Sequence, residues 1–466
     1  NKWILDDEDE EEPLRFITNP NKTRGILTAE LSKYLRGYPM NDVYWDTLHW
    51  YIENEDQTTK RVLKSLFYRN VPKKLKSKTI EHIYDRTIQS SVSRLETYFQ
   101  CSYHYFAQYT LQLKERSRYQ LQAPDIGQLF HESLRWITEW VYEDGKAFYD
   151  LTDQEILKYV ERAIEKLAPV LNHQILFSSN RYRFILNKLK QVVFRATKML
   201  AYQSKHSQFS PAGIEVGFGR RNQLPPLTLP LSNGYILELS GRIDRVDRAE
   251  IDNQLYLRII DYKSSSRDLN LVDVYYGLAL QMLTYLDVVL THSSMWLGQQ
   301  AEPAGVLYFH VHNPTLSNLK KFDEASIEEE LIKSYRMKGL LLEDESVALA
   351  MDTSVSEEST SSKIVPFAIK KDGTFSKQGT KTVNQEIFQR MNDYVRSLMI
   401  RAGEEIVSGE VKLNPYEKKD MNACTYCPFK SVCQFDPILE ENKFRRLKEH
   451  SNNTIIEKIV TREGEL

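Results

Sequence analysis

Two aspartates and a lysine stand on two apolar, strand-like runs of the sequence. The first run contains Gly241-Arg242-Ile243-Asp244, and the second ends in Ile259-Ile260-Asp261-Tyr262-Lys263. Residues two apart in a strand project from the same face, so Asp261 and Lys263 should point together. Asp244 should meet them from the neighbouring strand. Carboxylates of this kind bind Mg²⁺ or Mn²⁺, which activates water and polarises a phosphoryl oxygen, and an ammonium neutralises charge on phosphate.

The spacing of an acid two residues before a lysine is a weak signal when it stands alone. The same spacing occurs at 144–146, 410–412, 417–419 and 441–443. Only Asp261 and Lys263 close an apolar strand that has an aspartate on its neighbour. The alternative is an ordinary ion pair at a solvated strand end, which the spacing alone leaves open.

Further residues would belong to such a site if the fold brings them there. His131 lies early in a helical segment, and Glu215 precedes the two strands. Their plain alternatives are a structural helical histidine and a surface acid. Gln281 and Tyr285 are four apart on a helix and share a face, which could point at the strand ends or merely pack. The candidate phosphate contacts, whose alternative is a solvated face, are Arg242, Arg245, Arg248 and residues 264–267.

The four cysteines form a second group with chemical potential. Cys424, Cys427 and Cys433 have the spacing C-x2-C-x5-C, and Cys101 lies far upstream. Four thiolates suit either a zinc ion or an iron–sulfur cluster. Zinc sites usually use two close pairs, whereas three ligands plus a distant fourth favour a cluster. The alternative is that Cys101 is a buried thiol and the other three bind nothing.

The elements that must position these residues follow from the pattern of apolar residues. A capping box at Thr152 and Glu155 opens one amphipathic helix. The sequence predicts further helices at 90–106, 182–202, 272–290 and 384–406, a hairpin of strands 235–247 and 255–263 with a polar turn at 249–254, a strand at 305–311 and a flexible insertion at about 343–363. This order describes an α/β protein with a small mixed sheet flanked by helices.

Composition and length set the outer limits. A chain of 466 residues exceeds one hydrophobic core, so two or three domains are expected. Residues 1–12 carry a local charge of −6, so the remainder carries +4, which permits a nucleic-acid partner. The first residue is Asn1, and we expect a piece of a longer chain. We find no signal peptide and no membrane-length apolar run, and we expect a cytoplasmic protein without a membrane partner.

These motifs together resemble a known family. The motifs Leu129-Phe130-His131, Gly241–Asp244, Asp261–Lys263 and Gln281-x-x-x-Tyr285 resemble those of RecB-type nucleases in the PD-(D/E)xK superfamily. The split cysteine pattern is similar to that of its iron–sulfur members. With Ser91–Glu96 and the segment around Cys101, the resemblance is closest to the nuclease domain of the B subunits of AddAB-type helicase–nucleases, over about 86–440. One departure is the aspartate at 261, where many members have glutamate; both bind Mg²⁺.

The resemblance implies a fold, cofactors and partners. The fold would be a restriction-endonuclease-like core with helical additions and an iron–sulfur staple. It implies a [4Fe-4S] cluster on Cys101, Cys424, Cys427 and Cys433, and Mg²⁺ or Mn²⁺ held by His131, Asp244, Asp261 and the carbonyl of Tyr262. Asp244, Asp261, Lys263, Gln281 and Tyr285 would be catalytic.

The implied activity is hydrolysis of a DNA single strand from a broken duplex end, beside the A-type helicase partner of a heterodimeric helicase–nuclease. Residues 1–85 would be the end of a helicase-like region and 441–466 a charged tail. No G-x-x-x-x-G-K-[ST] motif occurs, so the sequence has no ATP-site signature. Two alternatives are weighed: a catalytically idle iron–sulfur DNA-binding scaffold, and a stand-alone CRISPR-associated or repair nuclease.

Overall fold

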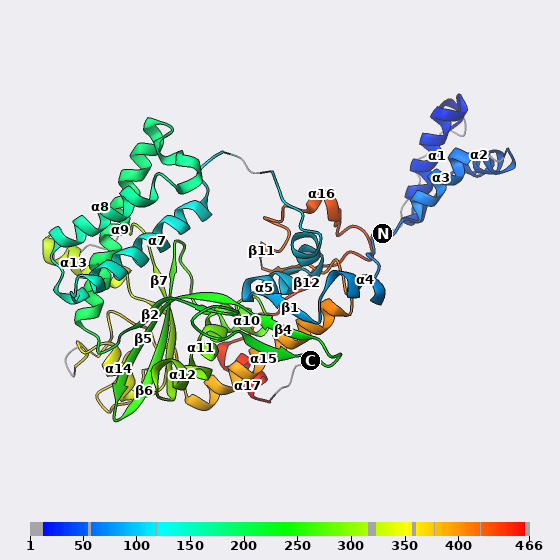
Figure 1. The fold of residues 1–466 in the computed structure, drawn as a ribbon. Helices are drawn as coiled ribbons and strands as arrows, with labels where there is room; N and C mark the ends of the chain where they lie inside the picture. Colours follow the sequence, from blue (N-terminus) through cyan, green and yellow to red (C-terminus); the bar gives the residue numbers. More distant parts are fainter. Residues whose placement is uncertain are drawn as a thin grey trace. The chain divides into compact units, whose positions relative to one another are not determined.

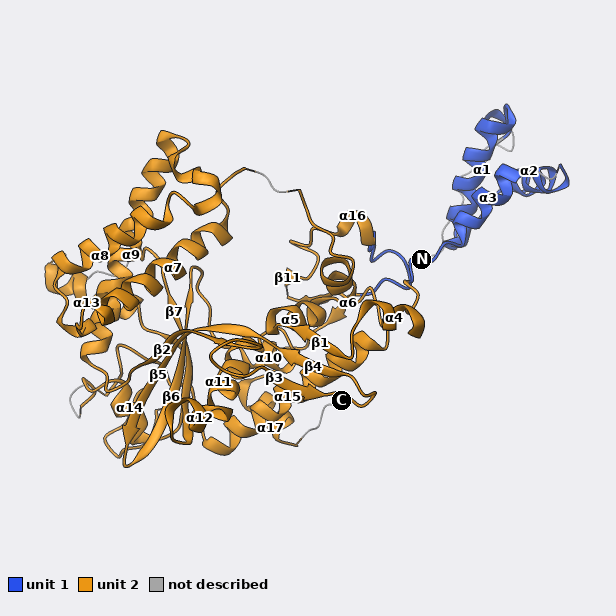
Figure 2. Ribbon diagram, in the orientation of Figure 1, with its two compact units in different colours: residues 1–71, 434–443 blue, residues 72–433, 444–466 orange. Residues whose placement is uncertain are grey.

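The computed structural model describes residues 13–54, 57–116, 119–315, 323–356, 360–376, 378–419 and 421–461, so the acidic segment 1–12 lies outside the described residues. Two compact units are present (Figure 2). The first comprises Asn1–Val71 with Gln434–Lys443, and the second comprises Pro72–Cys433 with Phe444–Leu466. All four cysteines and all predicted catalytic residues belong to the second unit, and the division falls before the predicted boundary at 85.

The first unit is a small helical body with an apolar core of its own. Asn19 and Asn41 cap its two longer helices by accepting hydrogen bonds from backbone N–H groups. Its core side chains are Leu27, Leu31, Tyr44 and Tyr51. Its helices are η1 (Pro13–Phe16), α1 (Pro20–Leu35), α2 (Asp42–Glu53) and α3 (Gln57–Leu66).

The second unit is built on a six-stranded mixed sheet, so the predicted α/β class is confirmed. Its strand order is β2-β5-β6-β7-β8-β9. The pairs β6–β7 and β8–β9 are parallel, and the other neighbours are antiparallel. The strands are β2 (Ser210–Phe218), β5 (Gly241–Ile251), β6 (Gln254–Lys263), β7 (Ala301–His310), β8 (Lys338–Leu342) and β9 (Thr382–Val383).

The hairpin β5–β6 places the predicted aspartates. Its turn consists of Asp252 and Asn253, which both have left-handed φ values of 50° and 64°. Such a two-residue turn matches the twist of paired strands and favours Asn and Asp. The turn is therefore shorter than the predicted 249–254, because pairing continues to Ile251 opposite Gln254. Strand β6 is buried along most of its length, as the inner strand of the sheet.

Helices cover the sheet on both sides (Figure 1). α7 contacts β2 and β6, whereas α11 contacts β6 and β7 and packs against α15. The predicted capping box of Thr152 and Glu155 is present at the start of α8. These helices are α7 (Ala123–Glu143), α8 (Asp153–Leu167), α9 (Asn180–Lys205), α11 (Gln281–Thr291) and α15 (Gln385–Val407). Shorter ones are α4 (Ser77–Ile83), η3 (Phe148–Asp150), η4 (Leu171–Phe177), α12 (Ser293–Leu297) and α13 (Glu324–Ser334).

Three predicted elements are interrupted. The strand expected at 235–247 divides into β5 and β4 (Ile236–Leu239), which pairs with β1 (Thr87–Ser90) and β3 (Leu227–Pro230) in a separate sheet. The helix expected at 272–290 breaks after α10 (Leu271–Tyr275). Gly277 has a φ of +78° there, and an added Cβ would lie 2.4 Å from the Phe99 ring. The helix expected at 90–106 breaks at Cys101 into α5 (Val92–Gln100), α6 (Ser102–Tyr105) and a π-helical turn, η2 (Phe106–Thr110).

Two segments predicted as flexible or tail-like contain buried helices, and these predictions were wrong for those residues. Within 343–363, α14 (Glu345–Met351) buries Val347, Ala348 and Met351, because its polar residues occupy only the outer face. Within 441–466, α17 (Asn452–Thr461) buries Ile455 and Ile459 in the main core.

The cysteine-rich segment forms a small sheet beside Cys101. Its elements are β10 (Tyr416–Lys418), β11 (Met421–Asn422), α16 (Lys430–Cys433) and β12 (Arg445–Arg446). Tyr103 N donates to Lys412 O at 3.0 Å, and Ser102 N donates to Asn414 Oδ1 at 2.9 Å. None of the helices in the described ranges is long and apolar enough to cross a membrane.

Candidate active site and cysteine group

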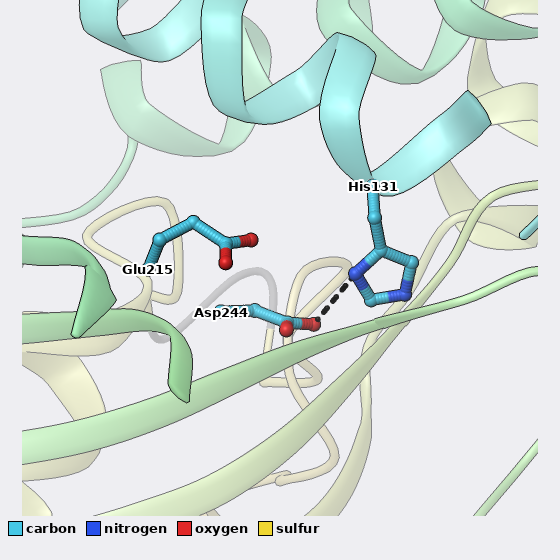
Figure 3. A group of neighbouring side chains, drawn as sticks. All are labelled: His131, Glu215 and Asp244. Carbon is cyan, nitrogen blue, oxygen red and sulfur yellow. Dashed lines mark ion pairs between the residues drawn. The ribbon is translucent and has the colours of Figure 1, made fainter. Parts of the chain in front are cut away.

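Three metal-ligating side chains converge where α7, β2 and β5 meet. His131 comes from α7, Glu215 from β2 and Asp244 from β5 (Figure 3). One ligand atom from each lies within 4.8 Å of the others. His131 Nδ1 is 3.2 Å from Asp244 Oδ2. The sequence predicts His131 and Asp244 as metal ligands. It offers Glu215 only as a further candidate for the site, outside the predicted ligand set.

The backbone holds these groups in place. Tyr262 N donates to Asp244 Oδ2 at 2.8 Å, so the second strand of the hairpin orients the carboxylate on the first. Glu215 has a left-handed φ of 51°, close to an irregularity in the pairing of β2 with β5. A non-glycine residue in this conformation costs about 1–3 kcal/mol. Such strain persists where the surrounding structure fixes the residue, as at binding and catalytic sites.

Asp261 and Lys263 form the second half of the site. Lys263 Nζ lies 2.6 Å from Asp261 Oδ2, as the shared strand face predicts. The same oxygen is buried and makes no well-aligned hydrogen bond within the described part of the chain. Burial, and then the charge of Asp244, raises the pKa of Asp261 to about 6. This buried oxygen has the Lys263 ammonium beside it, and the carboxylate keeps lone pairs with which it can bind a metal ion.

Neighbouring groups also shift Glu215 and His131. Burial, followed by the charge of Asp244, raises the pKa of Glu215 to about 7. Burial alone would lower the pKa of His131, but the hydrogen bond and the charge of Asp244 outweigh it and raise that pKa. Crowded carboxylates and a histidine with shifted pKa values are typical of functional sites.

The helix α11 presents the predicted glutamine and tyrosine together. Gln281 Nε2 donates to Tyr285 OH at 2.9 Å. Glu96, which the site prediction omitted, accepts hydrogen bonds from the backbone N–H groups of Leu280 and Gln281 at 2.8 and 3.1 Å and so caps this helix. Gly241 allows Phe218 and Tyr285 to approach, because an added Cβ would lie 2.7 Å from the Phe218 ring. No sequence pattern signals the Glu96 contact, since its partners lie far along the chain.

The predicted phosphate contact at Arg245 was wrong. Arg245 is 5% exposed, and its guanidinium donates to both oxygens of Asp247. Arg258 donates to the same carboxylate from β6. These three charges form a buried structural group. Arg242, Arg248 and Arg267 are exposed, and Arg242 lies 3.5 Å from Glu215.

The four cysteines lie near one another in the second unit. The charge of Cys424 interacts with those of Cys101, Cys427 and Cys433. Burial raises the pKa of the Cys101 thiol, and the backbone N–H groups of His104, Asn414 and Tyr103 offset this in part. Among the described residues, no three cysteine sulfurs lie within 4.8 Å of one another. Hydrogen bonds from Ser102 N to Asn414 and from Tyr103 N to Lys412 bring the segment of Cys101 next to the segment that leads to the other three cysteines.

Comparison with protein-family models gives two matches. Residues 89–434 match the model of the PD-(D/E)XK nuclease superfamily. Residues 9–65 match the model of the ATP-dependent helicase/deoxyribonuclease AddB fifth domain. The first match contains the sheet, the site and all four cysteines, and the second lies within the small helical unit.

Curated relatives resemble the whole chain. The B subunit of an ATP-dependent helicase/deoxyribonuclease from Oceanobacillus iheyensis is 53% identical over 99% of this chain and 40% of its own length. Proteins with the same name from Bacillus subtilis and Bacillus pumilus are 44% and 42% identical, over 96% and 98% of this chain and 38% and 39% of their own lengths. The chain therefore spans about two fifths of the length of these relatives.

Proposed function

The chain belongs to the PD-(D/E)XK nuclease superfamily, and on that premise we propose that its second unit hydrolyses phosphodiester bonds in DNA. The main observation is the convergence of His131, Glu215 and Asp244 beside the ion pair of buried Asp261 and half-buried Lys263. Carboxylates at a strand end with an adjacent ammonium match the needs of metal-assisted phosphodiester hydrolysis.

The donor set fits Mg²⁺ or Mn²⁺. We propose His131, Asp244, Asp261, the carbonyl of Tyr262 and, in addition, Glu215 as the residues that hold the ion. The ion supplies an activated water and neutralises phosphate charge when it is bound. Lys263 contributes a second positive charge beside the scissile phosphate. Gln281 and Tyr285, hydrogen-bonded to each other on α11, would position substrate or water.

We propose a [4Fe-4S] cluster on Cys101, Cys424, Cys427 and Cys433. Burial raises the pKa of the Cys101 thiol and nearby backbone N–H groups offset this only in part, so bound iron would have to stabilise the thiolate. A tetrahedral zinc ion, with Zn–S bonds of about 2.3 Å, would set the sulfurs about 3.8 Å apart. The arrangement of the ligands along the chain, three within 424–433 and the fourth at 101, favours the cluster over zinc, whose sites usually use two close pairs.

The names of the relatives support a proposal about the assembly. We propose that the whole protein is one component of a cytoplasmic helicase–nuclease, that a second, helicase-bearing component is its partner, and that the substrate is a single strand from a broken duplex end. Residues 1–85 would then belong to the end of the helicase-like region. The idle-scaffold alternative is disfavoured because Asp244, Asp261 and Lys263 are all present with site-like geometry. The stand-alone alternative is disfavoured by the relatives' greater length.

A nuclease assay tests the proposed activity. The 466-residue chain should cleave a labelled DNA single strand with Mg²⁺, and Asp261→Asn should lower the rate by about 10²–10³. The shape of the side chain is kept, so folding should be retained. Asp372→Asn, at an exposed loop, is the control and should cleave like the wild type. Wild-type cleavage by Asp261→Asn would move the active site elsewhere.

Metal analysis tests the cluster separately. The purified chain should be brown and contain about four iron atoms and four sulfides, on the family resemblance. Zinc in a colourless wild-type protein would contradict the cluster without touching the nuclease proposal.

A further inference from the structure

Two cavities lie side by side along α5 and the π-helical turn η2. The first has a volume of about 580 Å³ and is lined by residues including Tyr84, Arg86, Arg94, Tyr109 and Arg220. The second, of about 570 Å³, shares Arg94 and Tyr109 and reaches Pro428 and Phe429 in the cysteine-rich segment. Because Arg94 and Tyr109 line both cavities, the two cavities are neighbours, and we call them together the path. Neither cavity includes a residue of the proposed active site.

Two of the three arginines that line this path lie over tyrosine rings and have no acidic partner among the described residues. The Arg86 guanidinium lies 4.9 Å from the centre of the Tyr235 ring, and that of Arg94 lies 5.0 Å from the centre of the Tyr109 ring. Both side chains are exposed, and within the described residues neither forms an ion pair. Arg220, by contrast, is paired with Glu238 at 2.6 Å. Two neighbouring cations without carboxylate partners favour an anionic ligand.

Tyr109 stands on an unusual piece of backbone. Residues Phe106–Thr110 form a π-helical turn, a rare conformation that is frequent at functional sites. Tyr109 is half-buried, with its ring 5.3 Å from the ring of Tyr105. Tyr84 OH and Thr110 Oγ1 form a hydrogen bond of 2.7 Å that ties the turn to the cavity wall. The turn thus holds an aromatic ring at the point where the cavities meet.

The chemistry distinguishes between two kinds of ligand. Strand β1 is an edge strand whose described partner is β4 alone, so an added peptide strand is conceivable. A peptide strand, however, needs backbone pairing and side-chain pockets rather than arginines on tyrosine rings. Phosphates beside arginines and bases stacked on aromatic rings are what single-stranded nucleic acid requires. The acids on the path, Asp85 and Glu115, are fewer than its basic residues, which include Lys114.

We propose that this path binds a DNA single strand outside the cleavage site, with Arg86 and Arg94 on phosphates and a base stacked on the face of Tyr109 that Arg94 covers in the free protein, so that Arg94 turns from the ring to a phosphate. The inference rests on the proposed nuclease function, and it adds a second contact region that leads toward the cysteine segment. The path would hold the strand while the metal site acts on another part of it.

Binding measurements with matched variants test the proposal. A labelled oligothymidine of about 20 nucleotides, long enough for several phosphate contacts, is titrated with the full chain in EDTA, from low to moderate salt. Arg86→Gln and Arg94→Gln should each flatten the slope of log K against log salt by about 0.7, the value for one phosphate contact on a single strand. Tyr109→Ala should weaken binding by about fivefold or more, as for loss of a stacked base. Iodouracil-substituted DNA should cross-link to Tyr109 on irradiation.

Controls separate this proposal from misfolding and from failure of the nuclease proposal. Arg94→Lys keeps the charge and should keep the salt slope, and Arg390→Gln, on the exposed side of α15, should bind like the wild type. Hydrolysis of bis(p-nitrophenyl) phosphate, which is too small to span both regions, should be unchanged in Arg94→Gln. Wild-type salt slopes in both arginine variants would overturn the path, and so would cross-links confined to α7 and β5. A wild-type chain that neither binds nor cleaves DNA would instead overturn the proposed function on which the path rests.

Discussion

At the scale of single residues, Glu215 and Asp261 hold protons that ordinary carboxyl groups lose at lower pH. Their pKa values of about 7 and 6 reflect burial first and the nearby Asp244 charge second. Without a cation, protonation of these two groups reduces the repulsion between neighbouring carboxylates. A bound divalent ion would replace the protons, so metal affinity and proton release are linked at this site.

Stability in EDTA should depend on pH through Glu215. The folded chain keeps this proton up to about pH 7, whereas an unfolded chain loses it near 4.5. The folded state thus binds the extra proton between these values, and the contribution of Glu215 to stability falls as pH rises through that window. Urea unfolding at about pH 5, 6, 7 and 8 should show a steeper decline for the wild type than for Glu215→Gln. Equal pH dependence of the two proteins would contradict the raised pKa.

Metal affinity should show the opposite trend. Because protons and Mg²⁺ compete for Glu215 and Asp261, affinity should rise as pH increases from about 5.5 to 8, by up to about tenfold per unit where one proton is displaced. Calorimetry in buffers of different ionisation enthalpy counts the released protons. Glu215→Gln should release fewer protons at about pH 6.5 than the wild type, and an unchanged count would remove Glu215 from the ligand set.

Strand alternation explains which charged residues were predictable. Asp261 and Lys263 share a face as their spacing predicts, and their charged groups lie 2.6 Å apart. The same rule puts Arg245 on the strand face of Ile243, which is buried. A phosphate contact of Arg245 could therefore have been rejected from the sequence. The orientation of Glu215 could not be foreseen, because its left-handed backbone depends on how β2 pairs with β5.

At the scale of elements, the hairpin β5–β6 is fixed by a buried charge group as well as by its turn. Asp247 lies directly opposite Arg258 in the pairing, and its carboxylate accepts hydrogen bonds from both Arg245 and Arg258. Asp247 is fully buried. A one-residue slip of the β5–β6 pairing would separate these groups and leave buried charges without partners. The charge group therefore stabilises the register that places Asp244 and Asp261 side by side.

Asp247→Asn should destabilise the second unit by about 3–5 kcal/mol, because it leaves two buried guanidinium groups without their shared counter-charge. Chemical denaturation measures the change in unfolding free energy. Glu250→Gln, an exposed position on the same strand, is the matched control and should change it by less than about 0.5 kcal/mol. A near-neutral Asp247→Asn would mean that water or a neighbouring group compensates the arginines.

The sequence predicted elements well where apolar periodicity was strong and failed where tertiary contacts decide. The helix at 182–202 is present as α9, whereas the helix at 272–290 breaks at Gly277, where the Phe99 ring leaves no room for a side chain. The composition of 343–363, rich in Ser and Glu, hid the short buried face of α14. The amino-acid composition of such a segment is dominated by the exposed residues, so it does not predict the few side chains that the helix buries.

At the scale of the whole second unit, the segments before and after the nuclease core are joined in several ways. Tyr98 OH donates to Glu405 Oε2 at 2.6 Å, between α5 and α15. The Arg445 guanidinium donates to Phe99 O, and its backbone N–H group donates to Pro415 O at 2.9 Å. From the sequence, the only ground for grouping Cys101 with the three C-terminal cysteines was that the chain has four cysteines in all. These hydrogen bonds show the physical means by which the ends are held close without a covalent link.

A cluster on the four cysteines would add a covalent closure of about 323 residues to these contacts. Chain-entropy estimates give such a closure at most about 5–6 kcal/mol. Cys101→Ser should therefore lose the brown colour and unfold at a lower denaturant concentration. Native-state proteolysis mapped by mass spectrometry should cut first near α5 and near 412–433, while the sheet with Asp244 and Asp261 resists longest. Because the hydrogen bonds of Tyr98 and Arg445 remain, we expect local opening at these segments rather than collapse of the whole unit. A Cys101→Ser protein with wild-type protease resistance would show that these hydrogen bonds suffice and that the cysteine group serves another purpose.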